Sequence, residues 1–198
     1  WAVAERADRV LAHARCDGDG DLTLLLEDAL AGSDAATVAA AGARGVDVVA
    51  IDPDAALPFT ATFDVVAVDA PCSGLGTLRR DPDIKWRRTP DDLRTFQARQ
   101  LDLLERASRC VAAGGALVYT TCSTEPEENV DVVARWLEAH PDFARVAADA
   151  GPDGATLRPF LSAEGDFVTD AVRDGLEGYF GAVLVRAPRG RVPGAVVQ

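Results

Sequence analysis

The sequence predicts one α/β domain with a doubly wound sheet, and three observations support this prediction. The chain has 198 residues, which is within the usual size of a single domain. Its 48% hydrophobic and 26% charged residues are the balance of a globular protein and exclude disorder over the whole length. Short apolar runs rich in valine alternate with segments of helical spacing, which is typical of strands joined by helices.

The first part of the chain is assigned from local composition. Residues 1–15 fit either a short helix or a strand around residues 9–11. Residues 17–21 alternate aspartate with glycine and are expected to form an acidic turn. The leucines of 22–31 and the alanines of 34–43 predict two helices, the second of which ends at Gly45.

Three apolar runs predict buried parallel strands. They cover residues 46–51, 63–68 and 116–119, and each is bounded by turn residues or polar residues. Aspartates follow the first two runs, and a cysteine follows the third. Ligands of doubly wound folds bind at the carboxyl ends of the strands. The residues expected to meet there are Asp52, Asp69 through Cys72, Thr121 and Cys122.

Helices and loops are predicted between and after these strands. Residues 71–89 have the composition of a loop, and Thr89-Pro90 followed by acidic residues is a typical helix start. That helix is expected to reach about residue 112 and to stop at the glycines at 114–115. The remaining predictions are a helix from Pro126 to near His140, an irregular region over 144–175, a strand over 178–186 and a frayed tail over 187–198.

The overall charge argues against tight, unaided binding of nucleic acid. Asp and Glu total 32 against 20 Lys and Arg, which gives a net charge of −12. One segment differs, because residues 79–88 hold five basic and two acidic residues. Trp86 lies within this segment, and exposed aromatic and basic side chains are the groups that bind unpaired RNA bases.

The cysteines predict a reduced protein with no zinc site. They stand at 16, 72, 110 and 122, so no pair has C-x-x-C spacing, and no metal site is expected. Few cysteines, no membrane-length apolar run and no signal-peptide pattern lead us to expect a cytoplasmic protein. Cys110 lies in an apolar helical pattern and is expected in the core. The absence of methionine predicts that the chain is a fragment.

Two turns after strands carry the most specific pattern in the sequence. One reads Asp-Ala-Pro-Cys-Ser-Gly at 69–74, and the other reads Thr-Cys-Ser-Thr-Glu-Pro-Glu-Glu-Asn at 121–129. In this order they resemble the paired cysteine motifs of RsmB/Sun-type RNA (cytosine-5) methyltransferases, and among these the bacterial small-subunit rRNA enzymes most. The resemblance includes the loop over 76–86, and it is close over 57–140 and loose over 160–186.

The resemblance implies a fold, a reaction and a set of residues. The fold is the Rossmann-like methyltransferase fold over residues 1–186, with 1–45 atypical and the N-terminal half incomplete. The reaction is transfer of a methyl group from S-adenosylmethionine to C5 of cytosine in rRNA, with RNA as the partner. Cys122 is implied as the nucleophile, Cys72 as the residue that resolves the adduct, and Asp69 as the residue that holds the cytosine. Cofactor contacts are implied for Asp52, Asp69 and Pro71, and RNA contacts are expected at Arg79, Arg80, Lys85, Trp86 and Arg88.

The chemistry explains why such a site needs a thiolate. C5 of cytosine is a poor nucleophile, and addition of a thiolate to C6 makes C5 enamine-like. The thiolate is the reactive species, so the pKa of the nucleophilic cysteine has to be lowered or a base has to lie nearby.

Two assignments stay open for Asp52. The resemblance implies that it contacts the adenine of the cofactor, and in a second register it binds the ribose instead.

The N-terminal segment departs from the family and leaves two alternatives open. The glycine-rich cofactor loop, Ala-Pro-Gly-Gly-Lys-Thr, is not present, and its nearest candidate over 9–23 carries three aspartates that would repel the cofactor's carboxylate. The first alternative is a remnant that binds RNA or a partner without the cofactor. The second is a DNA cytosine methyltransferase, which uses its Pro-Cys cysteine as nucleophile, and the additional Thr-Cys motif argues against it.

Overall fold

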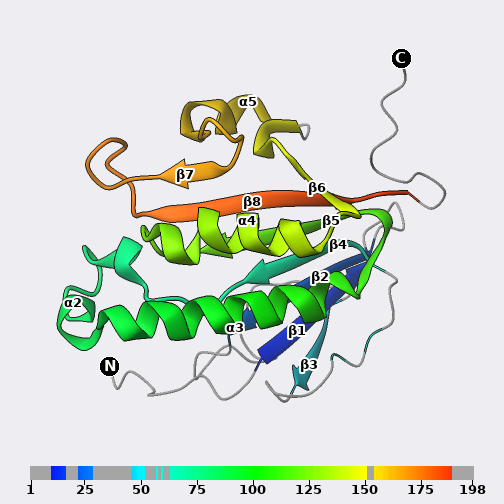
Figure 1. The fold of residues 1–198 in the computed structure, drawn as a ribbon, viewed down its shortest axis with the longest axis horizontal. Coiled ribbons are helices and arrows are strands. Elements are labelled where there is room, and N and C mark those ends of the chain that lie inside the picture. The colour runs from blue at the N-terminus through cyan, green and yellow to red at the C-terminus, as the bar shows by residue number, and fades with distance from the viewer. Residues whose placement is uncertain are drawn as a thin grey trace.

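The computed structural model describes residues 10–16, 22–28, 46–51, 57, 59, 63–150 and 154–188, and within them it forms a mixed α/β sheet (Figure 1). The strand order is β3-β1-β2-β4-β5-β8-β6, and β7 pairs with β8 outside that path. The predicted α/β class is confirmed. The strands are β1 (Val10–Cys16), β2 (Leu22–Asp28), β3 (Val46–Ile51), β4 (Phe63–Asp69), β5 (Val111–Thr121), β6 (Phe143–Val146), β7 (Phe167–Thr169) and β8 (Tyr179–Arg186).

The centre of the sheet is parallel and supplies the core. β4 pairs in parallel with β2 on one side and with β5 on the other. α3 (Pro90–Ser108) and α4 (Val130–Ala139) lie side by side over this part of the sheet (Figure 1). The fully buried side chains that join the helices to the sheet include Val66, Val68, Leu104, Leu117, Val132 and Val133.

α3 begins where the sequence predicts and ends earlier. The Asp92 carboxylate accepts hydrogen bonds from the Thr89 backbone N–H at 2.7 Å and from the Thr89 hydroxyl at 2.9 Å, which fixes the first turn. The helix ends at Ser108, and the predicted extension to about 112 is wrong because β5 already begins at Val111. Cys110 is buried as predicted, in the turn between the two elements rather than in a helix.

The glycines at 114 and 115 lie inside β5 instead of ending a helix. Gly114 has a φ of +85°, which suits a residue without a side chain, and the β4–β5 register shifts at this point. A Cβ at Gly115 would lie 2.8 Å from the Asp64 carbonyl oxygen, so the close approach of the two strands requires glycine there. The two glycines therefore mark an irregularity within a strand, and the prediction that they end a helix is wrong.

The N-terminal strands correct two predictions. Residues 22–28 form β2 and not part of a helix, because their backbone pairs with β1 on one side and β4 on the other. A short leucine run does not distinguish the two structures by its periodicity, and here pairing decides. β3 is a strand as predicted, but it pairs antiparallel with β1. The predicted helix over 34–43 and the tail from 189 lie outside the described residues.

The region after α4 is more regular than predicted. β6, the short helix α5 (Gly154–Leu157) and β7 lie within the stretch over 144–175 that was expected to be irregular, and β8 confirms the strand predicted over 178–186. The loop over 71–89 contains the 3₁₀ turn η1 (Leu75–Thr77) and the short helix α2 (Ile84–Arg87). α4 is preceded by the 3₁₀ turn η2 (Pro126–Glu128), and further 3₁₀ turns are η3 (Ala148–Ala150) and η4 (Arg158–Phe160).

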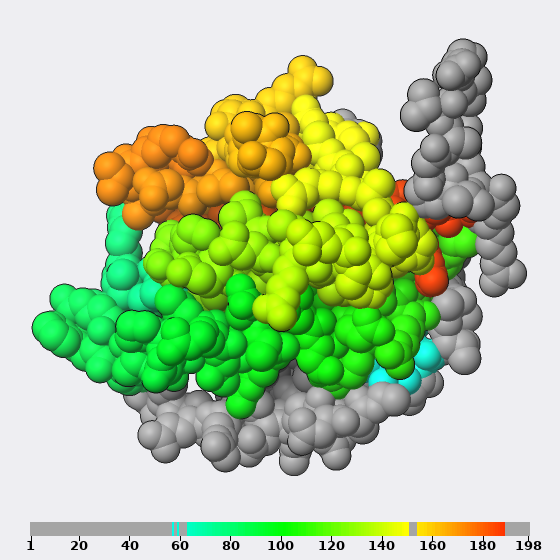
Figure 2. Space-filling view, in the orientation of Figure 1, coloured from blue at the N-terminus to red at the C-terminus, as the bar shows by residue number. Residues whose placement is uncertain are grey.

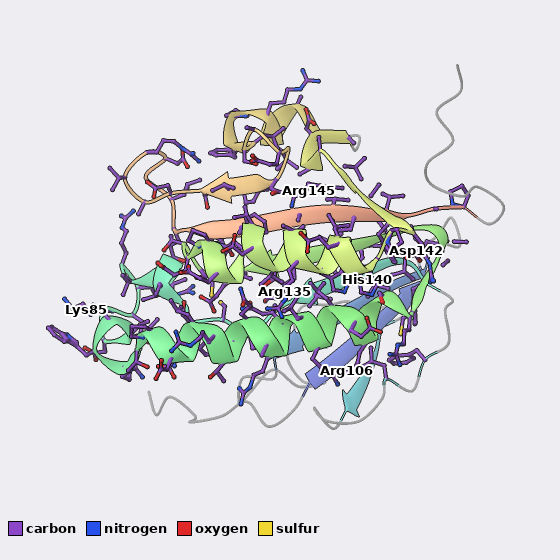
Figure 3. All side chains as sticks on the ribbon, viewed as in Figure 1. Lys85, Arg106, Arg135, His140, Asp142 and Arg145 are labelled. Carbon is purple, nitrogen blue, oxygen red and sulfur yellow. The ribbon has the colours of Figure 1, made fainter. Side chains whose placement is uncertain are left out.

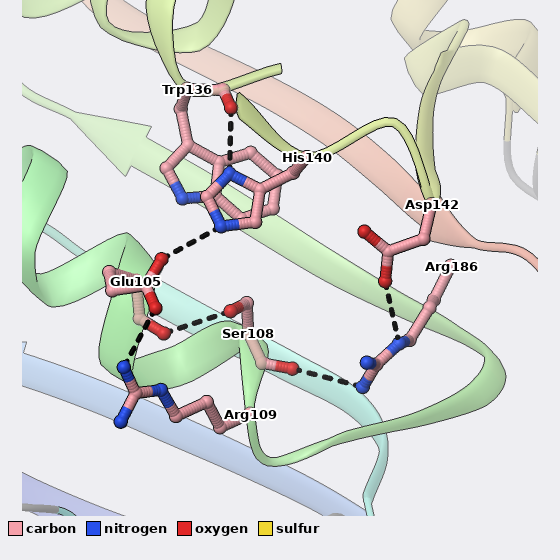
Figure 4. A network of polar contacts seen from close by, with 7 residues as sticks. All are labelled: Glu105, Ser108, Arg109, Trp136, His140, Asp142 and Arg186. Carbon is pink, nitrogen blue, oxygen red and sulfur yellow. Dashed lines mark hydrogen bonds and ion pairs between the residues drawn. The ribbon is translucent and has the colours of Figure 1, made fainter. Parts of the chain in front are cut away.

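A polar network joins the ends of α3, α4 and β8 on the side away from the cysteine turns (Figure 4). The His140 ring stacks on Trp136 at 3.9 Å between centroids and contacts the Glu105 carboxylate through Nε2 at 2.7 Å. A hydrogen bond from Arg109, together with His140, holds the pKa of Glu105 below its usual value. Arg186 bridges to Asp142 at 3.1 Å. This network fixes the helices against the sheet.

No helix in the described part has the length and apolarity that crossing a membrane requires.

Candidate active site

The two cysteine turns meet at the carboxyl edge of β4 and β5. Parallel pairing sets Asp69 opposite Thr120, and the Ala70 backbone N–H donates to the Thr120 carbonyl at 2.9 Å. The chain then turns in the same direction after each strand. As a result the Sγ atoms of Cys72 and Cys122, 50 residues apart in the sequence, lie 3.3 Å apart, and both residues are half-buried. The structure thus brings together the predicted Asp69, Cys72 and Cys122.

The environment shifts the pKa values of the two thiols in opposite directions. A hydrogen bond from the Cys72 thiol holds the pKa of Cys122 below its usual value and is helped by Arg80, although burial and the Asp69 carboxylate act against it. The same hydrogen bond raises the pKa of Cys72 well above its usual value, and burial and the negative charges of Cys122 and Glu128 raise it further. Cys122 is therefore the thiol of the pair that ionises more readily, and Cys72 is the one that holds its proton more firmly.

A buried carboxylate joins the two turns from behind, and the sequence analysis did not single it out. Glu128 has an exposure of 0%. Its Oε1 accepts from the Ser73 backbone N–H at 2.8 Å and from Gln100 Nε2 at 3.3 Å. Its Oε2 accepts from the hydroxyls of Ser73 and Ser123, each at 2.5 Å. The signal in the sequence is that both serines directly follow the cysteines.

Further polar contacts hold the segment that carries Glu128. The Tyr119 hydroxyl donates to the Glu128 carbonyl at 2.7 Å, and Asn129 Nδ2 donates to the Ser123 carbonyl at 2.9 Å. The Thr121 hydroxyl donates to Asn129 Oδ1 at 2.6 Å. These residues are all buried. The Glu-Glu-Asn part of the second motif is therefore a support for the turn as well as the start of α4.

Two glycines let a third segment pass directly behind Cys122. The Gly76 backbone N–H donates to the Cys122 carbonyl at 3.0 Å, and the Gly178 N–H donates to the Gly76 carbonyl at 2.8 Å. A Cβ on Gly76 would lie 2.0 Å from the Gly178 carbonyl oxygen, so no other residue fits this crossing. The loop after Cys72 is in this way fixed to the hairpin that leads into β8.

The basic segment divides into internal and exposed contacts. Arg79 donates to the Gly175 carbonyl at 2.9 Å, Arg88 donates through Nε to the Ser73 carbonyl at 2.9 Å, and Arg80 lies 3.8 Å from Glu177. Trp86 is 79% exposed, and Lys85 Nζ lies 4.9 Å from its ring centroid. Lys85 lies at the tip of a projection (Figure 3), and the α2 region and the 165–178 hairpin project at the same end of the molecule (Figure 2).

The strands on either side of the candidate cofactor loop over 9–23 are placed in the sheet. Cys16 and Leu22 flank residues 17–21, and both lie at the edge where β4 begins, opposite to Asp69. These two flanking residues therefore lie at the other end of the sheet from the cysteines. Residues 17–21 themselves lie outside the described residues.

The predicted cofactor residues are placed in part. Asp52 is outside the described residues, but Ile51 before it is the last residue of β3. Across the sheet, Ile51 pairs with Val10, and Val10 pairs with Asp28 at the end of β2. The residue before Asp28, Glu27, pairs with Asp69. The chain therefore leaves β3 at the same edge as the cysteine turns. Asp69 is exposed and lies 3.4 Å from the Thr120 hydroxyl, and Pro71 is half-buried with its carbonyl bonded to Gln100. Among the described side chains, no group of three or more His, Cys, Asp or Glu is placed to hold a metal ion.

Comparisons with known proteins agree with this geometry. The family model described as 16S rRNA methyltransferase RsmB/F matches residues 32–158. A Bacillus subtilis protein named probable ribosomal RNA small subunit methyltransferase B is 38% identical over 119 residues, 60% of this chain and 25% of that protein. Ribosomal RNA small subunit methyltransferase B of Vibrio cholerae is 37% identical over 122 residues, 62% of this chain and 25% of that protein. The chain thus spans about a quarter of the length of these relatives.

A solved structure shares the fold. NSun6 from Pyrococcus horikoshii with SFG has a TM-score of 0.58 and 22% sequence identity, over 76% of this chain and 37% of that one. At this identity the likeness concerns the fold alone, and it confirms the predicted Rossmann-like methyltransferase fold.

The opposite pKa shifts of Cys122 and Cys72 predict that an alkylating agent reacts with one of them first. Iodoacetamide at pH 7 is expected to modify Cys122 before Cys72, with a half-maximal rate at a pH below the value of about 8.5 for a free thiol. Peptide mapping by mass spectrometry identifies the modified residue, and the buried Cys110 stays unmodified while the protein is folded. Cys72→Ala removes the hydrogen bond to Cys122 and should move the Cys122 profile to higher pH. Faster reaction of Cys72 contradicts the assignment.

Proposed function

Because this chain belongs to the 16S rRNA methyltransferase RsmB/F family, we propose that it methylates C5 of a cytosine in small-subunit rRNA through a covalent adduct with Cys122. The observation that carries the proposal is the pair of sulfur atoms 3.3 Å apart at the carboxyl edge of the sheet. One cysteine of the pair has the lowered pKa of a nucleophile and the other retains its proton. The proposal assigns the catalytic domain to residues 1–186, with the motifs over 57–140.

The residues of the site divide the reaction between them. The Cys122 thiolate adds to C6 of the cytosine, and the electron pair of the C5–C6 bond then makes C5 nucleophilic. Asp69 orients the ring and favours protonation at N3, which stabilises the adduct. Once C5 carries the methyl group, loss of its proton to a base restores the double bond and expels the Cys122 thiolate. The Cys72 thiol contacts the departing sulfur and assists its release.

The described residues at this edge fit S-adenosylmethionine. The exposed carboxylate of Asp69 and the hydroxyl of Thr120 beside it suit the cationic and hydroxyl-bearing parts of this cofactor. Asp69, Pro71 and Asp52 would hold it. When bound, it supplies an electrophilic methyl group. The structure of NSun6 from Pyrococcus horikoshii contains SFG, an analogue of S-adenosylmethionine, and this supports the same cofactor for this chain.

RNA is proposed to contact the exposed part of the basic segment. Trp86 presents a ring for stacking on an unpaired base, and Lys85 beside it supplies charge for the phosphates. Arg79, Arg80 and Arg88 face the RNA side as well, but each also contacts the protein, so they shape the loop around Cys122. The net charge of −12 makes this local surface the part of the chain suited to RNA.

The alternative of a remnant without cofactor binding has one observation in its favour. No segment of the sequence matches the glycine-rich cofactor loop of the family, and the described residues that flank 17–21 lie at the edge opposite to the cysteines. In that case the cysteine pair would be retained without methyl transfer, and the basic segment would bind RNA or a partner.

Substitution of the two cysteines separates their roles. Cys122→Ala is expected to abolish methylation of an rRNA fragment, because the nucleophile is lost. Cys72→Ala is expected to accumulate a covalent protein–RNA adduct, which a shifted band on a denaturing gel detects. Methylation that survives in Cys122→Ala, or adducts formed through Cys72, would remove the proposed mechanism.

Calorimetric titration with S-adenosylhomocysteine tests the cofactor. We expect binding in the micromolar range, about −8 kcal/mol, if the chain retains the pocket. Asp69→Asn should weaken it, whereas Asp64→Asn, an exposed aspartate on the same strand, should leave it unchanged. Absence of heat at millimolar ligand favours the remnant over the enzyme.

Substitutions in the basic segment test the RNA surface. Trp86→Ala is expected to weaken binding of an rRNA fragment by about 1–3 kcal/mol, the value of one stacked base. Lys85→Ala should reduce the slope of log affinity against log salt by about one. Arg135→Ala removes a charge from the exposed face of α4 and serves as the control. Equal losses in all three variants would show that the segment has no specific role.

A further inference from the structure

We propose that Glu128 is the positioning residue of the cysteine pair: it ties the two cysteine turns together and so holds the two thiols in contact. This inference rests on the proposed function for its catalytic meaning. The geometry on which it stands does not, because the contacts of Glu128 with the two turns are features of the fold.

Glu128 is hydrogen-bonded through both of its carboxyl oxygens. Each serine hydroxyl accepts a backbone N–H, from Leu75 at 3.4 Å for Ser73 and from Glu125 at 3.1 Å for Ser123. Each hydroxyl lies 2.5 Å from Glu128 Oε2, and the two hydroxyls lie 3.2 Å from each other. Two N–H groups donate to Oε1. Four polar groups therefore converge on the two carboxyl oxygens of Glu128.

The position of this carboxylate determines the separation of the sulfurs. Ser73 follows Cys72 and Ser123 follows Cys122, so one side chain controls the residue next to each cysteine. The two serine oxygens lie 3.2 Å apart, which closely parallels the 3.3 Å between the two sulfurs. The backbone bond from Gly76 to the Cys122 carbonyl already joins the two turns. Glu128 adds an anchor directly beside the two cysteines, because both serine hydroxyls bind the same oxygen atom.

The charge of Glu128 acts unequally on the two thiols. Its carboxylate raises the pKa of Cys72, whereas Arg80 lowers and Asp69 raises the pKa of Cys122. A negative charge behind Cys72 disfavours a thiolate there, so the proton shared by the pair stays on Cys72. The charged and titratable groups around the pair are Asp69, Arg80, Tyr119, Glu128 and Tyr179.

The test measures which cysteine is a thiolate, without RNA or cofactor. Iodoacetamide labelling across pH 5–9 is followed by peptide mapping of Cys72 and Cys122. Glu128→Gln keeps the size of the side chain and removes its charge. The ratio of Cys72 to Cys122 labelling is expected to rise by about tenfold, which corresponds to a relative pKa change of one unit. Glu127→Gln, the exposed neighbour, is the matched control and should give the wild-type ratio.

Two further variants separate charge from tether. Glu128→Asp restores the charge with a shorter reach and should return the labelling ratio toward the wild-type value. Ser73→Ala with Ser123→Ala keeps the charge and removes both hydroxyl contacts, and here we expect slower closure of the Cys72–Cys122 disulfide by diamide, by several-fold. That oxidant removes one hydrogen from each thiol and is itself reduced to the hydrazine.

The outcomes decide the proposal in each case. Labelling of the buried Cys110 reports loss of the fold, and if Glu128→Gln shows it, the serine variant decides. An unchanged labelling ratio in folded Glu128→Gln, or unchanged disulfide closure in the serine variant, overturns the proposal. If the unsubstituted protein does not methylate RNA but the variants change labelling and disulfide closure as expected, the proposed function fails and this inference stands.

Discussion

The parallel pairing of β4 with β5 is the constraint on which the rest of the site depends. It sets Asp69 beside Thr120, so the residues that follow each strand leave the sheet at one edge and in one direction. β4 is central and its core side chains Val66 and Val68 are fully buried, which fixes its register because a slip of one residue would turn them outward. The two cysteines meet because the apolar part of the strands leaves no other arrangement.

The chemistry of the pair arises from groups that touch only one of its members. Identical thiols in contact would share a proton evenly in a symmetric environment. Here burial raises the pKa of both thiols, while Arg80 and Asp69 act on Cys122 and Glu128 acts on Cys72. Hydrogen bonds from neutral donors replace the hydration of the buried Glu128 side chain. The two sulfurs in contact therefore differ in chemistry, with the pKa of Cys122 lowered and that of Cys72 raised.

The sequence predicts the chemistry of this chain better than the course of its backbone. Strands β4, β5 and β8, the start of α3 and the meeting of Cys72 with Cys122 all follow from apolar runs, a cap and two motifs. The strand over 22–28 was missed because leucine is compatible with helix and strand, and only pairing with β1 and β4 decides between them. The end of α3 was missed because the glycines at 114–115 mark a close approach of strands, which composition does not reveal.

Glu128 was missed for a related reason. An acidic residue at the start of a helix is usually exposed, and its burial depends on donors from residues 28 to 55 positions away in the chain. Such contacts have no local signature. The roles of Asp69, Cys72 and Cys122 in catalysis remain proposals that rest on their placement.

The crossing of Gly76 and Gly178 has a consequence for how this site can diverge. The two positions are 102 residues apart, but each occupies the space that the other's side chain would need. A methyl group on Gly76 would press on the carbonyl oxygens of Gly178 and Cys122, and one on Gly178 would press on the Thr124 methyl group and the Gly76 Cα. The loop that precedes α2 and the hairpin that leads into β8 are thus free to exchange their outward-facing residues, but not their spacing. The exposed residues of the loop and of the hairpin can therefore diverge, while the two glycines at the crossing stay the same.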